Sequence, residues 1–150
     1  MTTPFNVPAE ELIDEVAKKL QSDKNIKLPE GNMFNKTGPN CENPPENSDW
    51  WYVRCAAILR KIYIKDGMGV ERLRAEYGGK RDCGSKAYRA VSGSGSIVRR
   101  ALQQLETAGY VKKVKGKGRV VTSKGRSFLD NVSKDVLKNL GSGYKNLEKY

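Results

Sequence analysis

The sequence contains no histidine and only three cysteines among its 150 residues. Histidine is the commonest general base at neutral pH and the commonest metal ligand, so its absence removes the usual centre of both kinds of site. The cysteines, Cys41, Cys55 and Cys83, are odd in number and far apart, without a C-x-x-C pair. This spacing argues against a zinc site and against a disulfide framework. We therefore expect no enzymatic activity, no metal or other cofactor, and no small-molecule substrate.

Long apolar runs are also missing. No stretch of about 18 apolar residues occurs, so we expect no membrane-spanning helix. The first five residues contain neither basic side chains nor an apolar segment, which argues against a secretory signal. These absences favour a protein of the cytoplasm.

Acidic residues are few in comparison with basic ones. The 17 Asp and Glu stand against 28 Lys and Arg, which gives a net charge of +11. The excess is concentrated between Arg54 and Arg126, where 19 basic residues accompany only 5 acidic ones. Such a one-signed region indicates a polyanionic partner, either nucleic acid or an acidic membrane surface. The alternative is a solvated face that only keeps the protein soluble, but such a face usually mixes both signs, so contact with nucleic acid is favoured. We expect no membrane partner. The length is that of one ordinary domain, so we expect residues 1–150 to form a single domain.

Hydrophobic periodicity predicts helices over 8–20, 50–65, 70–77 and 96–108, and a last one from 122 or 123 to about 140. Asp49 is expected to cap the second helix, and Gly109 suits the left-handed position after the fourth. Within the second helix, Lys61 and Lys65 would lie within about 20° of Arg54 around the axis, at about 100° per residue. These three cations would then form one positive stripe.

The segments between the helices differ in character. Residues 24–48 are rich in proline, glycine and asparagine, and we expect a long extended connection, held to the surface by Ile26, Leu28, Met33 and Phe34. Residues 78–95 are expected to form a basic loop with interleaved aromatic residues. This loop is not a phosphate-binding P-loop, because Ser85 stands at the position where that motif needs lysine. Residues 110–122 predict a β-hairpin with a Lys/Gly tip. The Gly-Ser-Gly run at 141–143 ends the last helix, and 141–150 is expected to be a flexible tail.

This order of elements predicts a mostly α fold of the α+β class. It is the order of a winged helix-turn-helix with additional N-terminal and C-terminal helices. The helix over 96–108 would be the groove-reading helix and the hairpin over 110–122 the wing. Because winged helices bind DNA, RNA or other proteins, the fold alone does not decide the function.

Several motifs along the chain are similar to those of one family. They are DWWYVR at 49–54, ILRKIY at 58–63, GVERL at 69–73, YGG at 77–79, SGSI at 94–97, ALQQLE at 101–106, GRVVT at 118–122 and GRSFLD at 125–130. Together they resemble the small-subunit ribosomal proteins of the S-nineteen-e family, which archaea and eukaryotes share. The resemblance extends from about Val7 to Asp130, and its Lys/Gly hairpin and GRSFLD motif look more archaeal than eukaryotic.

The resemblance implies a structural constituent of the small ribosomal subunit that is cytoplasmic. It implies binding to the 3′ domain of the small-subunit rRNA in the subunit head, contacts with neighbouring small-subunit proteins, and a role in subunit assembly and maturation. The candidate RNA-binding residues come from the basic central helix, the YGG loop, the SGSI helix start, the short helix and the hairpin. They are Arg54, Arg60, Lys61, Lys65, Arg72, Lys80, Arg81, Ser94, Ser96, Arg99, Arg100, Lys115, Lys117 and Arg119.

Two loops depart from the family pattern. Between YGG and SGSI the family usually has a proline and a histidine or phenylalanine, where this chain has SKAYR at 85–89. The connection after the first helix normally contains a tryptophan, and here it reads GNMF at 31–34.

The alternative is a winged-helix transcription regulator that binds DNA. Such a regulator usually dimerises to read two half-sites. Apart from the C-terminal helix, the sequence offers no helix to spare for dimerisation, and we expect a monomer when free. The basic residues are also spread over several elements, which suits a protein in contact with irregular RNA.

Overall fold

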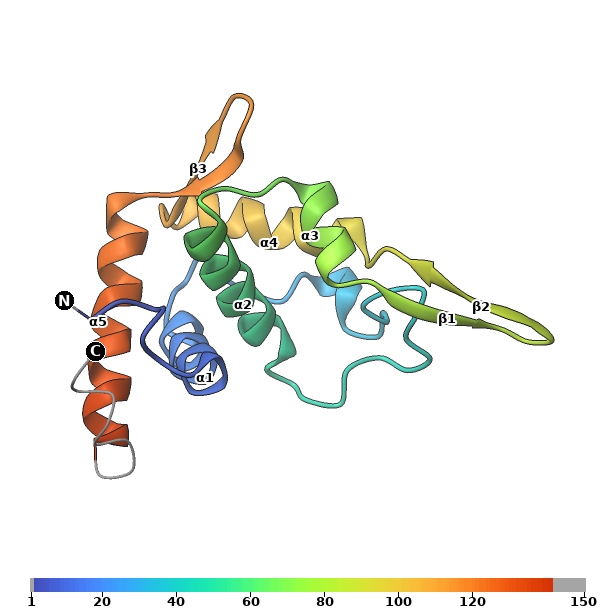
Figure 1. Cartoon of the computed structure of the whole chain (residues 1–150), viewed down its shortest axis with the longest axis horizontal. Coiled ribbons are helices and arrows are strands. Elements are labelled where there is room, and N and C mark those ends of the chain that lie inside the picture. The colour runs from blue at the N-terminus through green and yellow to red at the C-terminus, as the bar shows by residue number, and fades with distance from the viewer. Residues whose placement is uncertain (1, 142–150) are drawn as a thin grey trace.

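The computed structural model of the chain describes residues 2–141 (Figure 1). Its elements are α1 (Ala9–Gln21), the 3-10 turn η1 (Glu30–Asn32), α2 (Trp50–Lys65), α3 (Val70–Glu76), β1 (Gly79–Cys83), β2 (Lys86–Val91), α4 (Gly95–Thr107), β3 (Val111–Val114), β4 (Gly118–Val121) and α5 (Ser123–Leu140). The mostly α, α+β class is confirmed, and each predicted helix is present within one or two residues of its expected bounds. The order α2, α3, α4 and β3–β4 agrees with the expected winged arrangement, with α1 and α5 added. Among residues 2–141, no helix is both long and apolar enough to cross a bilayer.

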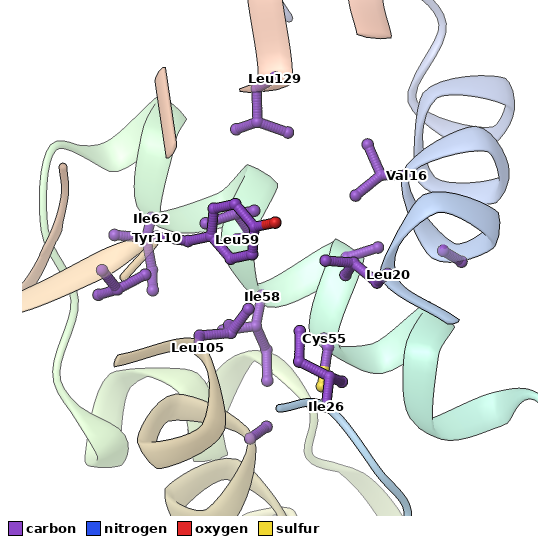
Figure 2. Packing of buried hydrophobic residues seen from close by; sticks show 14 of the residues in the cluster. Val16, Leu20, Ile26, Cys55, Ile58, Leu59, Ile62, Leu105, Tyr110 and Leu129 are labelled. Carbon is purple, nitrogen blue, oxygen red and sulfur yellow. The ribbon is translucent and has the colours of Figure 1, made fainter. Parts of the chain in front are cut away.

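Helix α2 occupies the centre because it is apolar on most sides. Its residues Cys55, Ile58, Leu59 and Ile62 are fully buried. They meet side chains from α1, α4 and α5, as the convergence of labelled residues in Figure 2 shows. Burial of this much apolar surface is the main favourable term in folding. It also makes α2 a rigid base for the polar side chains on its remaining face.

Helix α4 and the β3–β4 hairpin form as the sequence predicts. Ala101, Leu102 and Leu105 are fully buried, which is the stripe expected from their spacing. Gly109 ends the helix with φ +81°, in the left-handed region. The strands pair in antiparallel register from Val111 opposite Val121 to the Lys/Gly tip.

The helix starts agree only in part with the expected caps. Thr122 stands before α5, and its hydroxyl accepts a hydrogen bond from the Gly125 amide at 3.2 Å. Asp49 stands at the N-cap position of α2, as predicted, but its carboxylate accepts no bond from a helix amide. It lies instead 3.4 Å from the Ser48 hydroxyl.

The basic segment at 78–95 is a β-hairpin, and its prediction as a loop was wrong. Strands β1 and β2 pair antiparallel, with Arg81 opposite Arg89 and an irregularity before Cys83. The turn is made by Gly84, at φ +73°, whose amide donates to the Asp82 carboxylate at 2.9 Å. Most residues of both strands are exposed, so no alternation of apolar and polar residues marks them. The hairpin projects from the body as a long arm (Figure 1).

The connection at 24–48 lies over the body as expected, but two of its four expected anchors do not hold it. Ile26 is fully buried and Leu28 packs against the core, whereas Met33 is 66% and Phe34 86% exposed. Beside Met33, the connection is held by a polar contact, in which the Arg100 guanidinium donates to the side chain of buried Asn32 at 3.1 Å. The tail predicted to be flexible lies outside the described residues, apart from its first residue.

Candidate nucleic-acid interface

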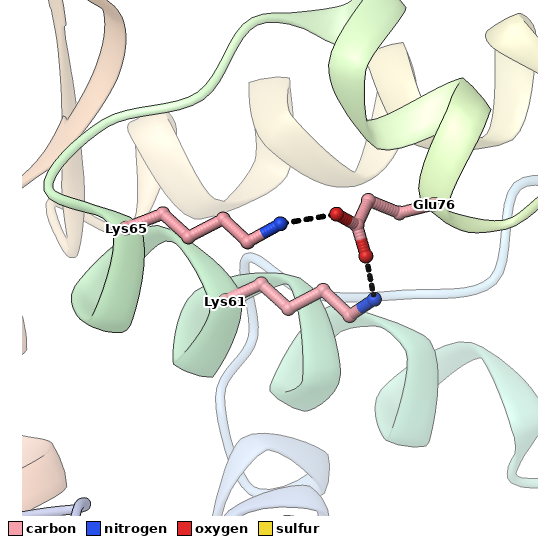
Figure 3. A network of polar contacts seen from close by, with 3 residues as sticks. All are labelled: Lys61, Lys65 and Glu76. Carbon is pink, nitrogen blue, oxygen red and sulfur yellow. Dashed lines mark hydrogen bonds and ion pairs between the residues drawn. The ribbon is translucent and has the colours of Figure 1, made fainter.

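Two lysines on one side of α2 share a carboxylate from α3. Lys61 Nζ lies 2.9 Å from Glu76 Oε2, and Lys65 Nζ bonds Glu76 Oε1 (Figure 3). The hydrogen bonds from Lys65 and Lys61 lower the pKa of the Glu76 carboxyl from 4.5 to about 2. Glu76 is therefore ionised at every physiological pH and holds both ammonium groups in place.

The same side of α2 contains a cation stacked on an aromatic ring. The Arg54 guanidinium lies 4.0 Å from the centre of the Tyr77 ring, and Lys61 Nζ lies 4.7 Å from it. Burial raises the pKa of Tyr77 to about 12, so its hydroxyl stays neutral. Burial also lowers the pKa of Arg54, but an arginine side chain stays charged in proteins. The ring therefore supports a fixed positive charge.

We call Arg54, Lys61 and Lys65, together with Glu76 and Tyr77, the cationic ridge. The prediction that the three cations share one side of α2 is confirmed by their linked partners, because Arg54 and Lys61 both contact the Tyr77 ring and Lys61 and Lys65 both bind Glu76. The stripe is not isolated in the fold, because Glu76 from α3 lies over it and reduces the charge of the three cations to +2. Glu76 and Tyr77 were missed because α3 must fold back on α2 to bring them there.

The ridge continues toward the tip of the β3–β4 hairpin. Lys65, Arg72 and Lys117 line one surface hollow, between the turn after α2, the start of α3 and the hairpin tip. Asp66 lies in the same hollow, and its carboxylate is 3.8 Å from Lys117 Nζ. The structure thus brings three predicted residues from three elements together.

The predicted residues at the start of α4 form a separate group. The hydroxyls of Ser94 and Ser96 lie 3.1 Å apart, and neither caps the helix. Arg99 is exposed, whereas the Arg100 guanidinium donates to the Asn32 side chain at 3.1 Å. Arg100 therefore also fixes the connection to the body.

Three other predicted residues do not join the ridge. Arg60 is half-buried, and its Nε lacks a hydrogen-bond partner within the described part of the chain. Arg119 is only 16% exposed at its side chain and lies 3.9 Å from Glu106. Lys115 is exposed at the hairpin tip. The first two are placed more like internal contacts than like surface groups.

The last two predicted residues, Lys80 and Arg81, are exposed on the β1–β2 hairpin. They face a part of the connection that includes Lys36, and Tyr88 lies in the same place. Sequence reasoning did not single out Lys36 or Tyr88 as site residues. The interleaving of Tyr88 with basic residues was the available signal, but its position opposite the connection depends on the hairpin.

The described residues show no grouping of three potential metal ligands. Cys55 lies in the core, and burial raises the pKa of its thiol to about 12. A neutral buried thiol is a poor nucleophile and a poor metal ligand.

Comparison with known proteins decides the family. A family model described as Ribosomal protein S19e matches residues 3–139. The chain belongs to this family. The expectation drawn from the sequence motifs is thereby confirmed, and the match also includes both loops that depart from the usual pattern.

Individual members of the S19e family are similar over most of their length. A small ribosomal subunit protein eS19 from Thermoplasma acidophilum is 50% identical over 134 residues, which cover 89% of each chain. That of Aeropyrum pernix is 43% identical over 152 aligned residues, or 100% of this chain and 99% of the relative. A small ribosomal subunit protein eS19G from Ascaris suum is 38% identical over 139 residues, or 92% of this chain and 94% of the relative. Of these three, the archaeal relatives have the higher identities.

Proposed function

We propose that the chain is a structural constituent of the small ribosomal subunit in the cytoplasm. In this proposal it binds the 3′ domain of the small-subunit rRNA in the subunit head, contacts neighbouring small-subunit proteins, and assists subunit assembly and maturation. The names of its relatives as small ribosomal subunit proteins support this assignment. Membership of a family of ribosomal proteins also supports a role without catalysis.

The observation that carries the RNA-binding part is the cationic ridge. Its cations stand on a buried helix, and Arg54 and Lys61 are held against the Tyr77 ring at 4.0 and 4.7 Å from its centre. A fixed row of cations suits a phosphate backbone, because the side chains lose little further freedom on binding. The hollow with Arg72 and Lys117 extends this row by two cations.

The distribution of charge favours RNA over DNA. A winged helix that reads DNA uses its recognition helix and wing, here α4 and β3–β4. In this chain the ridge lies on α2, and Lys80 and Arg81 lie on a different hairpin. Contacts from many elements suit the irregular surface of a folded RNA.

The test is filter binding of the whole chain to a 3′-domain rRNA fragment across a salt series. Arg54→Ala should lower the salt slope by roughly one unit and weaken binding, because each phosphate contact releases counterions. Lys115→Ala removes the same charge from the exposed hairpin tip and should have a smaller effect, because a flexible tip loses more entropy on contact. Incorporation of Arg54→Ala into small subunits should fall, while its thermal midpoint should show that it still folds.

A duplex DNA of equal length serves as the competing ligand. Tighter binding to this duplex, or a salt slope that Arg54→Ala leaves unchanged, would contradict the proposal. The first of these results would favour the winged-helix regulator.

A further inference from the structure

A surface hollow separates the β1–β2 hairpin from the connection that precedes α2. The connection contributes Lys36, Asn40 and Glu42 to its lining. The hairpin contributes Lys80, Arg81, Asp82 and Tyr88. Its volume is about 390 Å³. None of these residues belongs to the core, to the cationic ridge or to the group at the start of α4.

Two contacts hold the connection against the base of the hairpin. The Ser94 amide donates to the Thr37 carbonyl at 3.1 Å. At Gly79, a Cβ would lie only 2.7 Å from the Asn40 side-chain nitrogen, so the absence of a side chain allows Asn40 to approach β1. The hollow is therefore built from two segments that are distant in sequence and are packed together by these contacts.

Tyr88 presents an aromatic ring that the fold itself does not need. It is 67% exposed on β2. Alternation along the strands puts Tyr88 on the same face as Ala90, the cross-strand partner of Lys80. Proteins that bind single-stranded RNA often place an exposed aromatic side chain beside a cation. A base stacks on the aromatic ring, and the cation contacts the neighbouring phosphate.

The charges of the hollow favour an anion. Lys36, Lys80 and Arg81 form no ion pair with any of residues 2–141. Against these three cations stand two carboxylates, Glu42 and Asp82, so the lining has a net charge of +1, and Asp82 also accepts the Gly84 amide in the turn of the hairpin at 2.9 Å. Two cations, Lys36 on one wall and Lys80 on the other, therefore line the same hollow as the Tyr88 ring, and a phosphate would find partners on both walls.

We propose that this hollow holds one unpaired nucleotide of the rRNA. Its base stacks on the Tyr88 ring, and the adjoining phosphate lies between Lys36 of the connection and Lys80, which is on the Tyr88 face of the hairpin. An unpaired nucleotide is required because a base inside a duplex has no free face for the ring. This inference rests on the proposed function and adds to it a site, the two residues Lys36 and Tyr88, and the kind of nucleotide bound.

The experiment is filter binding of the whole chain to the 3′-domain rRNA fragment, with three aromatic variants. Tyr88→Leu should weaken binding about tenfold without changing the salt slope, because it removes stacking and no charge. Tyr88→Phe keeps the ring and should bind like the unchanged protein. Phe5→Leu is the matched control, since Phe5 is also well exposed, at 62%, but belongs to the N-terminal segment beside α5 (Figure 1).

A fourth variant, Lys36→Ala, tests the opposite wall. It leaves the hairpin intact and should reduce the salt slope by about one unit. The rRNA fragment with 5-iodouridine in its unpaired segments should, on irradiation, form a cross-link whose peptide contains Tyr88.

The possible failures are distinguishable. If Tyr88→Leu and Lys36→Ala bind like the unchanged protein while Arg54→Ala binds more weakly, the nucleotide site is wrong and the proposed function stands. An equal loss in Tyr88→Phe would assign the effect to the hydroxyl and overturn the stacking. If the unchanged protein does not bind the fragment at all, both proposals fall.

Discussion

The cationic ridge and the β1–β2 hairpin are both basic, but their charges are in different situations. On the ridge, Lys61 and Lys65 are bound to Glu76, and α2 beneath them is buried. On the hairpin, Lys80 and Arg81 are exposed and form no ion pair within residues 2–141. The ridge side chains are therefore held by contacts within the protein, whereas no ion pair within the described part of the chain holds those of Lys80 and Arg81.

This difference predicts different contributions to binding. Side chains that are already fixed lose little entropy on contact, but a carboxylate among them reduces the attraction for phosphate. Exposed side chains keep their full charge and lose rotamer freedom when they bind. The ridge should therefore determine where the RNA lies, and the hairpin should adapt to it. Three changes, ordered by the size of their expected effect, test this division.

The largest effect should follow from damage to the core under the ridge. Leu105 is fully buried and lies beside Ile58 of α2 in Figure 2. Leu105→Ala should lower the free energy of unfolding by about 2–5 kcal/mol, through lost burial and a cavity. Gln103→Ala, on the exposed side of the same helix, should change it by less than about 0.5 kcal/mol. Urea denaturation measures both, and equal small changes would show that α4 presents its other face to the core.

A smaller and more local effect is expected at the base of the hairpin. At Gly78, a Cβ would collide with the Val91 carbonyl oxygen and lie 3.1 Å from Ser92 Cα. Gly78→Ala should therefore cost about 1–3 kcal/mol, as overpacking does. Hydrogen exchange should become faster in β1 and β2 and stay slow in α2.

Gly31→Ala is the control for this change, because no described atom lies within 4 Å of the added Cβ. Its hydrogen exchange should match that of the unchanged protein throughout. If Gly78→Ala instead accelerates exchange in α2 as much as in the hairpin, then the hairpin and the ridge unfold as one cooperative unit. In that case they cannot contribute to binding as separate parts.

The same division explains which features the sequence could predict. The stripe of α4 could be predicted because Ala101, Leu102 and Leu105 face one core at a period of 3.6 residues. The strands of the β1–β2 hairpin could not be predicted, because they are exposed on both faces. Without a buried face, apolar and polar residues do not alternate along them. Hydrophobic periodicity in the sequence reveals an element only when one of its faces is buried. A hairpin with both faces exposed therefore gives no such signal.

The candidate site follows a similar rule. The common side of Arg54, Lys61 and Lys65 depends only on helix geometry, at about 100° per residue. The position of Glu76 over that side depends on the turn between α2 and α3, and that of Tyr88 on its strand pairing. Positions that depend on one element were predictable, whereas positions that depend on the packing of two were not.

The smallest effect, and the one that most directly tests the ridge, concerns Glu76. Its pKa is lowered to about 2 by Lys65 and Lys61. A lowered carboxyl pKa contributes stability that is present above its ordinary value of 4.5 and is lost as the pH falls toward 2. Nuclear magnetic resonance titration of the Glu76 carboxyl should therefore show a midpoint well below 4.5. A midpoint near 4.5 would mean that the two lysines are not held in solution.

Glu76→Gln tests the cost of this carboxylate to RNA binding. The change frees two lysines, so binding to the rRNA fragment should tighten a few-fold at low salt and the salt slope should become steeper. Glu71→Gln is the matched control: it removes the same charge from the same helix, where the carboxylate pairs with Arg74 at 3.0 Å and not with the ridge. Its effect should be smaller, because Arg74 lies outside the ridge and stays bound to the Gly93 carbonyl at 3.2 Å, so the change adds mainly to the general electrostatic attraction. If both variants tighten binding equally, only net charge matters at α3. If Glu76→Gln weakens binding, the carboxylate acts mainly by holding Lys61 and Lys65 where the phosphates lie.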